Sequence, residues 1–338
     1  MQEKFDPTVI ILSAGKGKRM CSTIPKVLHE VSSQPIIEYV IELASSLNCD
    51  PNNLNIVISE ELQNNKRFNN LCNKYILNKV LQRNRWGTGY ALRVACSNLK
   101  CMKDLVLVLY GDTPFIKRST ILKMYYMMIE CAADINVIGF YTSKPQGYGR
   151  IISSNNRIYD IVEDKDIHKV ENNLVLCNSG IFLIKKDTLL DFLNSKNNYQ
   201  YSLDNEFYLT SIIKDSIKSK KQCTYITTTE NEAMGINNRD QLLSAEHYNQ
   251  ANIINRLIYN GVTIVKPETS YFANNITIKN DVILYPNIFI GNSTVIMSNS
   301  VIHSFSYLEK SIINANSIIG PFAMIKGKSN TYNNSSAY

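Results

Sequence analysis

Basic side chains gather around a glycine-containing loop near the start of the chain. An apolar run, residues 9–12, breaks at a loop that carries Gly15, Gly17 and Arg19, and Lys26 follows within a few residues. Glycines let the main chain approach a ligand closely, and backbone N–H groups that follow a strand are suited to phosphate. Arginine grips a phosphate with two N–H groups, whereas lysine acts as a point charge. The chemistry that this stretch predicts is the binding of phosphate groups.

Three kinds of loop could follow such a strand, and the spacing fits the third. A P-loop needs its second glycine five residues after the first, where the chain has Met20. A dinucleotide-binding fingerprint needs a third glycine, and Met20 again stands in its place. The run Leu-x-Ala-Gly-x-Gly-x-Arg-Met at 12–20, with Pro-Lys at 25–26, resembles the signature of sugar-1-phosphate nucleotidyltransferases. The alternative is an ordinary turn between a strand and a helix, with solvated lysines.

Two further stretches place candidate ligand groups at the ends of expected elements. The most apolar run of the first half, residues 105–110, ends at Gly111 and Asp112. A carboxylate just past the C-terminal end of a buried strand lies at the crevice where doubly wound sheets bind ligands. Gly87 and Thr88 directly precede an amphipathic stretch, so we expect them at a helix N-terminus, where the helix dipole favours anions.

The elements that must position these side chains alternate between strand and helix. Strands are expected at about 8–13 and 55–58, and a helix with apolar residues at helical spacing begins near Pro35. The alternation predicts an α/β fold with a Rossmann-like, mostly parallel sheet and helices on both faces. Further along, we expect a strand at 135–141, a hairpin over 147–163 that turns at 155–156, a strand at 174–184, a helix at 205–219, a strand at 223–228 and a long helix that opens near 234 and stops at 260–261.

A six-residue period appears after the long helix. Isoleucine or leucine stands at 278, 284, 290, 296, 302 and 308, and Ile312 and Ile318 resume the period. This spacing is typical of a hexapeptide-repeat β-helix, in which each repeat forms one side of a triangular coil. The segment predicts a short left-handed parallel β-helix of about three coils. The alternative is a β-rich tail with accidental spacing.

Composition narrows the classes of function. The 338 residues are enough for two domains of roughly 100–200 residues each. The net charge of +7 is dispersed, without a basic stripe interleaved with aromatics, so we expect an anionic small substrate and no nucleic acid. Eight cysteines without a C-x-x-C pair and four scattered histidines argue against a zinc site. Without a signal peptide or an apolar run of about 18 residues, we expect no membrane insertion and a cytoplasmic protein with free thiols.

Together these features resemble the bacterial N-acetylglucosamine-1-phosphate uridylyltransferases, whose bifunctional form carries an acetyltransferase on a longer β-helix. The resemblance extends from about Val9 to Met324. The uridine-binding glutamine of the family stands five residues before its Gly-Thr, as Gln82 does before Gly87 here. Other family motifs recur as Tyr-Gly-Asp at 110–112, Gly-Tyr-Gly-Arg at 147–150, Glu163, Asn178 and Gly-Ile-Asn-Asn-Arg at 235–239.

The resemblance implies both a reaction and the residues that carry it. The phosphate of N-acetylglucosamine-1-phosphate attacks the α-phosphorus of UTP, which gives pyrophosphate and UDP-N-acetylglucosamine, a precursor for cell-wall and lipopolysaccharide synthesis. Mg²⁺ is the implied cofactor, with Asp112 and Asn237 as its ligands, Asn238 as the rival ligand, and Arg19 and Lys26 as the catalytic residues. The implied nucleotide-binding residues are Leu12, Ser13, Ala14, Gly15, Gly17, Lys26, Gln82, Gly87 and Thr88, and the implied sugar-phosphate-binding residues are Tyr110, Gly149, Glu163, Asn178 and Asn237.

Several of these residues have a plainer structural interpretation. A carboxylate after a strand can cap a turn, an asparagine can cap a helix, and polar side chains of loops and hairpins are often exposed. Asp112 could cap a turn, Asn237 could cap a helix, and the side chains of Glu163 and Gln82 could be exposed. Tyr208 and Thr210 lie in the segment that resembles the one closing over the sugar, and they could be core or helix-surface residues.

The sequence also departs from the family pattern. Ser13 replaces an alanine common in the family loop, and Lys18 replaces the usual threonine, which adds charge beside the triphosphate. The catalytic histidine and lysine of the acetyltransferase have no counterpart, and His303 is the histidine of the coils. We therefore expect no acetyltransferase activity.

The expected organisation is a nucleotidyltransferase domain at 1–236, a linker helix at 237–260, the β-helix at 261–328 and a flexible tail at 329–338. The resemblance implies a homo-oligomer, a trimer formed through the β-helix. Two other functions stay open. One is a nucleotidyltransferase for another sugar-1-phosphate, such as glucose-1-phosphate with UTP or dTTP. The other is a non-catalytic nucleotidyltransferase-like subunit, although such subunits have usually lost the loop arginine, the lysine or the acidic ligand.

Overall fold

The computed structural model describes residues 5–47, 50–99, 101–167, 174–195 and 206–327. The chain divides into two compact units. The first comprises the described residues of Met1–Leu28 and Ile36–Arg239, and the second those of His29–Pro35 and Asp240–Tyr338. The expected tail at 329–338 lies outside the described residues. None of the described helices is both long and apolar enough to cross a membrane.

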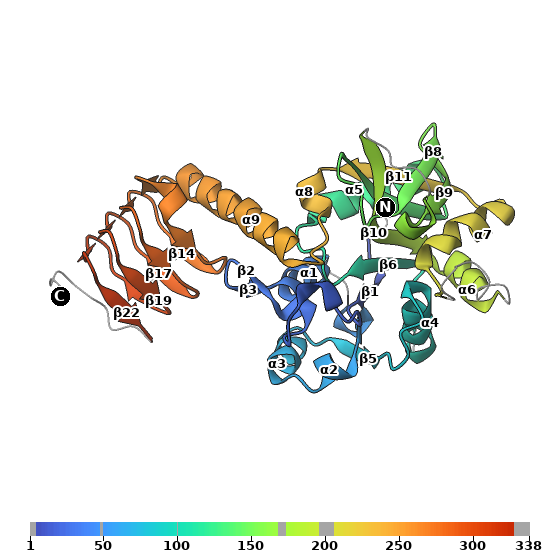
Figure 1. Ribbon diagram of the computed structural model, residues 1–338, viewed down its shortest axis with the longest axis horizontal. Coiled ribbons are helices and arrows are strands. Elements are labelled where there is room, and N and C mark those ends of the chain that lie inside the picture. The colour runs from blue at the N-terminus through green and yellow to red at the C-terminus, as the bar shows by residue number, and fades with distance from the viewer. Residues whose placement is uncertain (1–4, 48–49, 100, 168–173, 196–205, 328–338) are drawn as a thin grey trace. The chain divides into compact units, whose positions relative to one another are not determined.

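A nine-stranded sheet forms the centre of the first unit, in the order β5-β4-β1-β6-β10-β7-β11-β9-β8 (Figure 1). Strands β5, β4, β1 and β6 are parallel, as the alternation predicts. Strand β10 runs antiparallel to both β6 and β7, so the sheet is mixed beyond β6. The strands are β1 Thr8–Leu12, β4 Leu54–Ile58, β5 Asn78–Leu81, β6 Leu105–Tyr110, β7 Ile135–Thr142, β8 Arg150–Ser154, β9 Arg157–Val162, β10 Val175–Lys185 and β11 Cys223–Thr228.

Two hydrophobic cores cover the two faces of this sheet, because successive residues of a strand point to opposite sides. Ile11 of β1 and Leu109 of β6 pack with helices α1 and α5, whereas Ile10 and Val108 pack with α4, α6 and α7. Helices on both faces of the sheet confirm the predicted fold class. The helices of this unit are α1 Ile36–Ser46, α2 Glu60–Gln63, α3 Lys66–Lys74, α4 Thr88–Asn98, α5 Arg118–Glu130, α6 Lys186–Asn194, α7 Ile212–Lys218 and α8 Glu230–Ala233, and α9 Arg239–Tyr259 follows.

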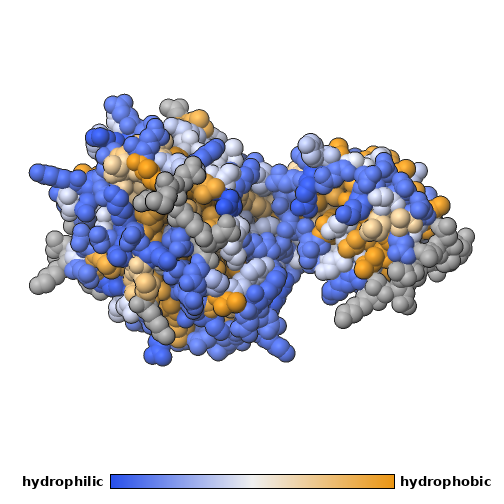
Figure 2. Space-filling view, turned by 180° about the vertical axis from the view of Figure 1, so that it is seen from behind, coloured by the Kyte–Doolittle hydropathy of each residue, from blue (hydrophilic) through white to orange (hydrophobic). Residues whose placement is uncertain are grey.

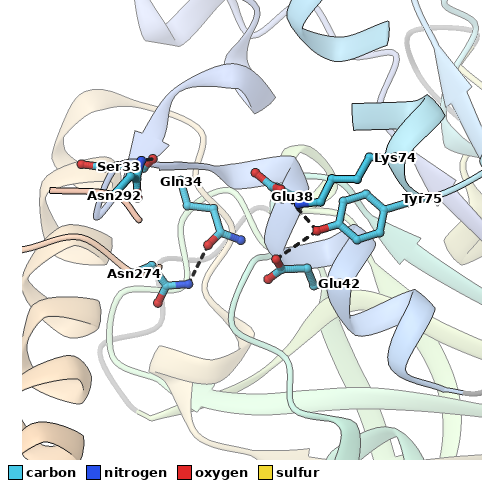
Figure 3. Close-up of polar contacts among 8 residues, drawn as sticks. All are labelled: Ser33, Gln34, Glu38, Glu42, Lys74, Tyr75, Asn274 and Asn292. Carbon is cyan, nitrogen blue, oxygen red and sulfur yellow. Dashed lines mark hydrogen bonds and ion pairs between the residues drawn. The ribbon is translucent and has the colours of Figure 1, made fainter. Parts of the chain in front are cut away.

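Polar contacts also join elements within this unit. At the end of α3, Lys74 Nζ lies 2.9 Å from Glu38 Oε1 of α1, and the Tyr75 hydroxyl donates to Glu42 Oε1 at 3.1 Å (Figure 3). Burial raises the pKa of Tyr75 to about 12. The seven cysteines that the structure describes all carry free thiols.

Two predicted helices begin later than their sequence pattern indicates. For the helix expected at 205–219, residue 205 lies outside the described residues, and a short 3₁₀ turn, Leu209–Ser211, precedes α7. The main chain of Phe207 is engaged elsewhere, because its N–H donates to Trp86 O and its carbonyl accepts from Gly89 N, both at 2.8 Å. The long helix expected from about 234 begins at Arg239, because Ile236 N donates to Asp112 O at 2.9 Å.

The second unit contains a β-helix of short parallel strands. Three sheets run along it, in the orders β12-β15-β18-β21, β13-β16-β19-β22 and β14-β17-β20, and Figure 1 shows their strands as successive rungs. Leu284, Ile290, Ile296 and Ile302 are fully buried inside, which confirms the hexapeptide period. The strands are β12 Thr263–Ile264, β13 Tyr271–Phe272, β14 Ile276–Ile278, β15 Ile283–Leu284, β16 Phe289–Ile290, β17 Thr294–Ile296, β18 Val301–Ile302, β19 Tyr307–Glu309, β20 Ile312–Ile313, β21 Ile318–Ile319 and β22 Met324–Lys326.

The period does not resume at Ile312 and Ile318, and that part of the prediction is wrong. These side chains are 41 % and 58 % exposed, whereas Ile313 and Ile319 point inward. Leu284 pairs with Ile302, and Ile302 pairs with Ile319, so the last coil is one residue shorter than the one before it. A slip of one residue moves each side chain of a strand to the opposite face.

A hairpin from early in the chain belongs to the second unit. It comprises β2 Glu30–Val31 and β3 Gln34–Pro35, joined by Ser32 and Ser33, which both have positive φ. Glu246 Oε2 accepts from Ser32 N at 2.6 Å. Asn274 and Asn292 donate to Gln34 Oε1 and Ser33 O at 2.6 and 2.8 Å (Figure 3). The second unit therefore includes a segment that begins at His29, three residues after Lys26 in the sequence.

Candidate functional site

A cavity of about 320 Å³ opens in the first unit at the C-terminal ends of β1 and β6. Its volume is within the range of small-molecule sites. Ten of the predicted site residues line it. They are Leu12, Ser13, Ala14, Gly15, Lys26, Gln82, Gly87, Thr88, Tyr110 and Asp112. The predicted nucleotide-binding residues other than Gly17, together with Tyr110 from the sugar-phosphate set, thus face one space.

The lysine and the carboxylate that the sequence places far apart meet in this cavity. Lys26 Nζ contacts Asp112 Oδ2 directly and donates to Asn237 Oδ1 at 3.0 Å. The side chains of Lys26 and Asp112 are only 12 % and 16 % exposed, so water weakens their attraction less than it would on an open surface. The side chain of Asp112 therefore does more than cap a turn. Helix α9 begins at Arg239, so Asn238, not Asn237, directly precedes it.

The position of Lys26 depends on a glycine in the phosphate loop. Gly17 has φ +60°, and a Cβ there would lie 2.6 Å from Lys26 Cβ. Lys26 itself begins a 3₁₀ turn, Lys26–Leu28, which Leu28 N closes by donating to Pro25 O at 2.8 Å. Gly17 is therefore needed for the close approach of the loop to Lys26, which is a different role from lining the cavity.

Arg19 lies away from the cavity lining. It is exposed, in the 3₁₀ turn Lys18–Met20, and a Cβ on Gly147 would lie 3.7 Å from its Nη1. The structure thus brings Arg19 beside the Gly-Tyr-Gly-Arg loop and brings Lys26 to Asp112. The two predicted catalytic residues occupy different places around the site.

The glycine loop before α4 is held by the segment around Phe207. Gly87 has φ +98°, and a Cβ there would lie 2.4 Å from Phe207 O. Thr88 Oγ1 accepts from Leu209 N at 3.0 Å. These contacts leave no room for a side chain at 87 and join the first turn of α4 to the segment 206–209. Glu206 and Tyr208 from that segment line the same cavity.

Gln82 and Ser13 are both buried. Gln82 is 4 % exposed and donates from Nε2 to Asn84 O at 2.9 Å, so the interpretation of an exposed side chain does not hold. Ser13 is 5 % exposed, and its hydroxyl has no hydrogen-bond partner among the described residues. A buried hydroxyl without a partner is costly, and this one stands where the family loop commonly has alanine.

The predicted sugar-binding residues form a second group beside the cavity. Glu163, whose Oε1 accepts from Thr210 Oγ1 at 2.5 Å, lines a smaller pocket of about 100 Å³ that also includes Glu206 and Tyr208. A Cβ on Gly149 would lie 3.8 Å from Glu163 Oε2. Asn178 N donates to Gly149 O at 2.8 Å. Burial raises the pKa of Glu163, and the hydrogen bond from Thr210 opposes that rise.

Sequence reasoning missed several groups at the site. Arg85 lines the cavity, and its position two residues before Gly87 could have identified it as a site residue. Asp164 fixes the Gly-Tyr-Gly-Arg loop, because its carboxylate accepts from Gly147 N at 2.7 Å and from Arg150 Nη2 at 3.0 Å. Thr210 donates a hydrogen bond to Glu163, a contact that the sequence did not predict.

A divalent cation fits the oxygen atoms around Lys26. The described residues contain no group of three or more His, Cys, Asp or Glu side chains arranged for a metal. The carboxylate of Asp112 and the amide oxygen of Asn237 nevertheless converge on one cationic atom, Lys26 Nζ. Mg²⁺ is commonly held by one or two protein oxygens, with water and substrate phosphates completing its shell. These two ligands match that pattern, provided that a phosphorylated substrate is present.

Part of the first unit matches a known protein family and a known fold. The family model described as a MobA-like NTP transferase domain matches residues 9–149. The nucleoside-diphosphate-sugar pyrophosphorylase from Vibrio cholerae RC9 has the same fold, with a TM-score of 0.55 over 70 % of this chain and 99 % of that one at 12 % identity.

Curated relatives extend the likeness across both units. The "Bifunctional protein GlmU" of Wolbachia pipientis wMel is 38 % identical over 95 % of this chain and 72 % of its own length. That of Bartonella quintana (strain Toulouse) is 34 % identical over 94 % and 69 %. With this extent of identity over more than two thirds of these relatives' own length, the chain belongs to the GlmU family.

Proposed function

We propose that this protein transfers a uridylyl group from UTP to N-acetylglucosamine-1-phosphate, giving UDP-N-acetylglucosamine and pyrophosphate. Membership of the family makes it a sugar-1-phosphate nucleotidyltransferase, and the two named substrates are the finer part of the proposal. The observation that carries it is that Lys26 contacts both Asp112 and Asn237, and that Lys26 and Asp112 line one cavity with the loop 12–15.

The reaction needs no nucleophile from the protein. An oxygen of the sugar phosphate is already an anion, so it can form the new bond to the α-phosphorus while the bond to the β-phosphate oxygen breaks and pyrophosphate leaves with the electron pair. No proton has to move. Catalysis then rests on positioning and on neutralising charge. Lys26 would supply positive charge to the triphosphate, and the backbone of 14–17 would hold its phosphates.

Enzymes of this family generally use a divalent metal, and we propose Mg²⁺. Asp112 and Asn237 would hold it, and when bound it would neutralise charge on the substrate phosphates. Gln82, Gly87 and Thr88 would bind the uracil and ribose, which the burial of Gln82 and the place of all three in the cavity support.

The residues around the smaller pocket would bind the sugar. Glu163, as a carboxylate, would accept hydrogen bonds from sugar hydroxyls, with Gly149 leaving room and Asn178 beside it. Tyr110, which lines the larger cavity, would lie between the nucleotide and the sugar phosphate. Arg19, beside Gly147, would neutralise charge from the side of the sugar loop.

A panel of substrates tests the proposal. Pyrophosphate release should be fastest with UTP and N-acetylglucosamine-1-phosphate, and slower with glucose-1-phosphate or dTTP. A preference for another pair would replace the substrates but keep the reaction, whereas no release with any pair would favour a non-catalytic subunit. The absence of acetyltransferase activity stays a prediction, and acetyl-coenzyme A turnover measured alongside tests it.

We also propose that copies of the chain associate through the β-helix as a trimer. Figure 2 shows apolar residues reaching the surface of the β-helix unit. In the same unit, Phe305 and Phe322 stack with ring centroids 5.2 Å apart, and their side chains are 55 % and 73 % exposed. Both have positive φ, which is costly for a residue with a side chain. Because contiguous exposed apolar surface marks interaction sites, we propose that this pair is part of the interface. Light scattering tests it, and a monomeric mass at micromolar concentration would contradict it.

A further inference from the structure

Lys26 places its ammonium group where the proposed metal would have to bind. Its Nζ contacts Asp112 Oδ2 and lies 3.0 Å from Asn237 Oδ1, and these two oxygens are the protein ligands that the site offers a cation. A lysine and a metal ion cannot both take this pair of ligands. In this structure the ammonium group of Lys26 therefore takes the position that the proposed metal would need.

The backbone on both sides of this contact is fixed. On one side, Gly17 packs against Lys26 Cβ and a 3₁₀ turn closes behind it. On the other, Ile236 N donates to Asp112 O, which ties the backbone beside Asn237 to that of Asp112. What can move is the long stem of the lysine, whose four carbons rotate freely and whose charge has no directional fork.

We propose that Lys26 is a placeholder cation, which leaves Asp112 and Asn237 only when a metal arrives together with nucleotide phosphates. This rests on the proposed function and adds to it the form of the substrate, a metal–nucleotide chelate. A free metal ion would have to displace the Lys26 ammonium from the Asp112 carboxylate, and the displaced ammonium would then have no new anionic partner. A chelate brings phosphates into the cavity, to which the ammonium moves while the metal takes its former ligands.

Removing the charge of Lys26 should change the affinity for a free metal ion and the affinity for the metal–nucleotide chelate in opposite directions. In Lys26→Met, free Mn²⁺ should bind at least about tenfold more tightly than in the wild type, because one neighbouring opposite charge shifts ion binding at a carboxylate by roughly 1–3 powers of ten. The Mn²⁺–UTP chelate should bind more weakly, because its phosphates lose their cation. Electron paramagnetic resonance of unbound Mn²⁺ measures both, without turnover.

Matched variants separate the placeholder role from a general loss of charge. Lys16 lines the same cavity from the phosphate loop, so Lys16→Met removes one positive charge from the same space. It should raise the affinity for free Mn²⁺ much less. Lys26→Arg keeps a cation on the carboxylate and should bind free Mn²⁺ as weakly as the wild type. Lys26→Met combined with Asp112→Asn should lose the gain.

The outcomes distinguish this proposal from the proposed function. Equal affinities for free Mn²⁺ in Lys26→Met, Lys16→Met and the wild type overturn the placeholder role, whatever the substrates are. A gain confined to Lys26→Met and abolished by Asp112→Asn supports it. If that gain appears but the wild-type protein does not bind the Mn²⁺–UTP chelate, the placeholder role of Lys26 stands and the assignment of UTP as substrate fails.

Discussion

Replacing Thr210 with valine should make Glu163 harder to ionise. Thr210 Oγ1 donates a 2.5 Å hydrogen bond to the Glu163 carboxylate, and burial already raises the pKa of that carboxyl. Valine has nearly the same shape but donates nothing. A hydrogen bond to a charged group contributes about 1.5–3 kcal/mol, and 1.36 kcal/mol corresponds to one pKa unit. The valine variant should therefore bind the Glu163 proton more tightly by a factor of about ten or more.

The assay is the pH dependence of kcat/KM for the sugar phosphate. Glu163 acts as a carboxylate in the proposed site, so activity rises as pH increases through its pKa. A higher pKa moves this acid limb upward, by about one pH unit. The substrate phosphate also titrates near pH 6, but equally for both proteins, so the ratio of their activities isolates the enzyme. Glu163→Gln should remove the part of the limb that comes from Glu163 and leave the part that comes from the substrate phosphate.

Stability gives a second readout that needs no substrate. The native state binds the Glu163 proton more tightly than the unfolded chain does, because burial raises the pKa of this carboxyl. The stability that protonated Glu163 contributes is therefore lost as pH rises through its native pKa. The valine variant should thus lose more stability at neutral pH than at acid pH.

A matched control is available in α6. Thr188 is 2 % exposed and its hydroxyl has no hydrogen-bond partner among the described residues. Thr188→Val should leave the acid limb where it is. An acid limb that stays in place in Thr210→Val, or one that moves equally in Thr188→Val, would refute the reasoning.

Three more predictions follow from single contacts. Asp112→Asn keeps the shape but removes the charge and should lower kcat by about 10²–10³, so near-normal pyrophosphate release with unchanged metal dependence would exclude its role. Ser13→Ala removes a buried hydroxyl without a described partner and should raise the free energy of unfolding by about 1 kcal/mol, whereas a loss in urea titrations would contradict this. Ile313→Ala should cost about 2–5 kcal/mol by creating a cavity, and Ile312→Ala less than about 1 kcal/mol; equal costs would mean that the register is wrong.

The parts of the site that the sequence predicted are those set by local geometry. The apolar runs that end at Leu12 and Tyr110 form adjacent parallel strands, and so the loops after them share one cavity. The glycines at 17 and 87 have the positive φ that makes a glycine necessary. Spacing along the chain is enough for such features, because parallel strands bring their C-terminal ends to the same edge of the sheet.

The parts that it did not predict depend on contacts between distant segments. The start of the helix near 205 was misplaced because Phe207 uses its main chain to pair with 86–89, a contact that propensity does not encode. The Thr210–Glu163 bond joins residues 47 apart. Ile312 and Ile313 are both isoleucine, so no pattern of residue types could tell which of them points inward once a coil is one residue short.

The most direct test of the central claim is a crystal structure with UTP and Mn²⁺, with the metal located by anomalous scattering. The account predicts a manganese peak bound by Asp112 and Asn237, triphosphate density along the loop 14–17 and the ammonium of Lys26 turned from Asp112 to a phosphate. A nucleotide bound in this cavity with manganese elsewhere, or Lys26 still on Asp112 beside a bound chelate, would contradict it.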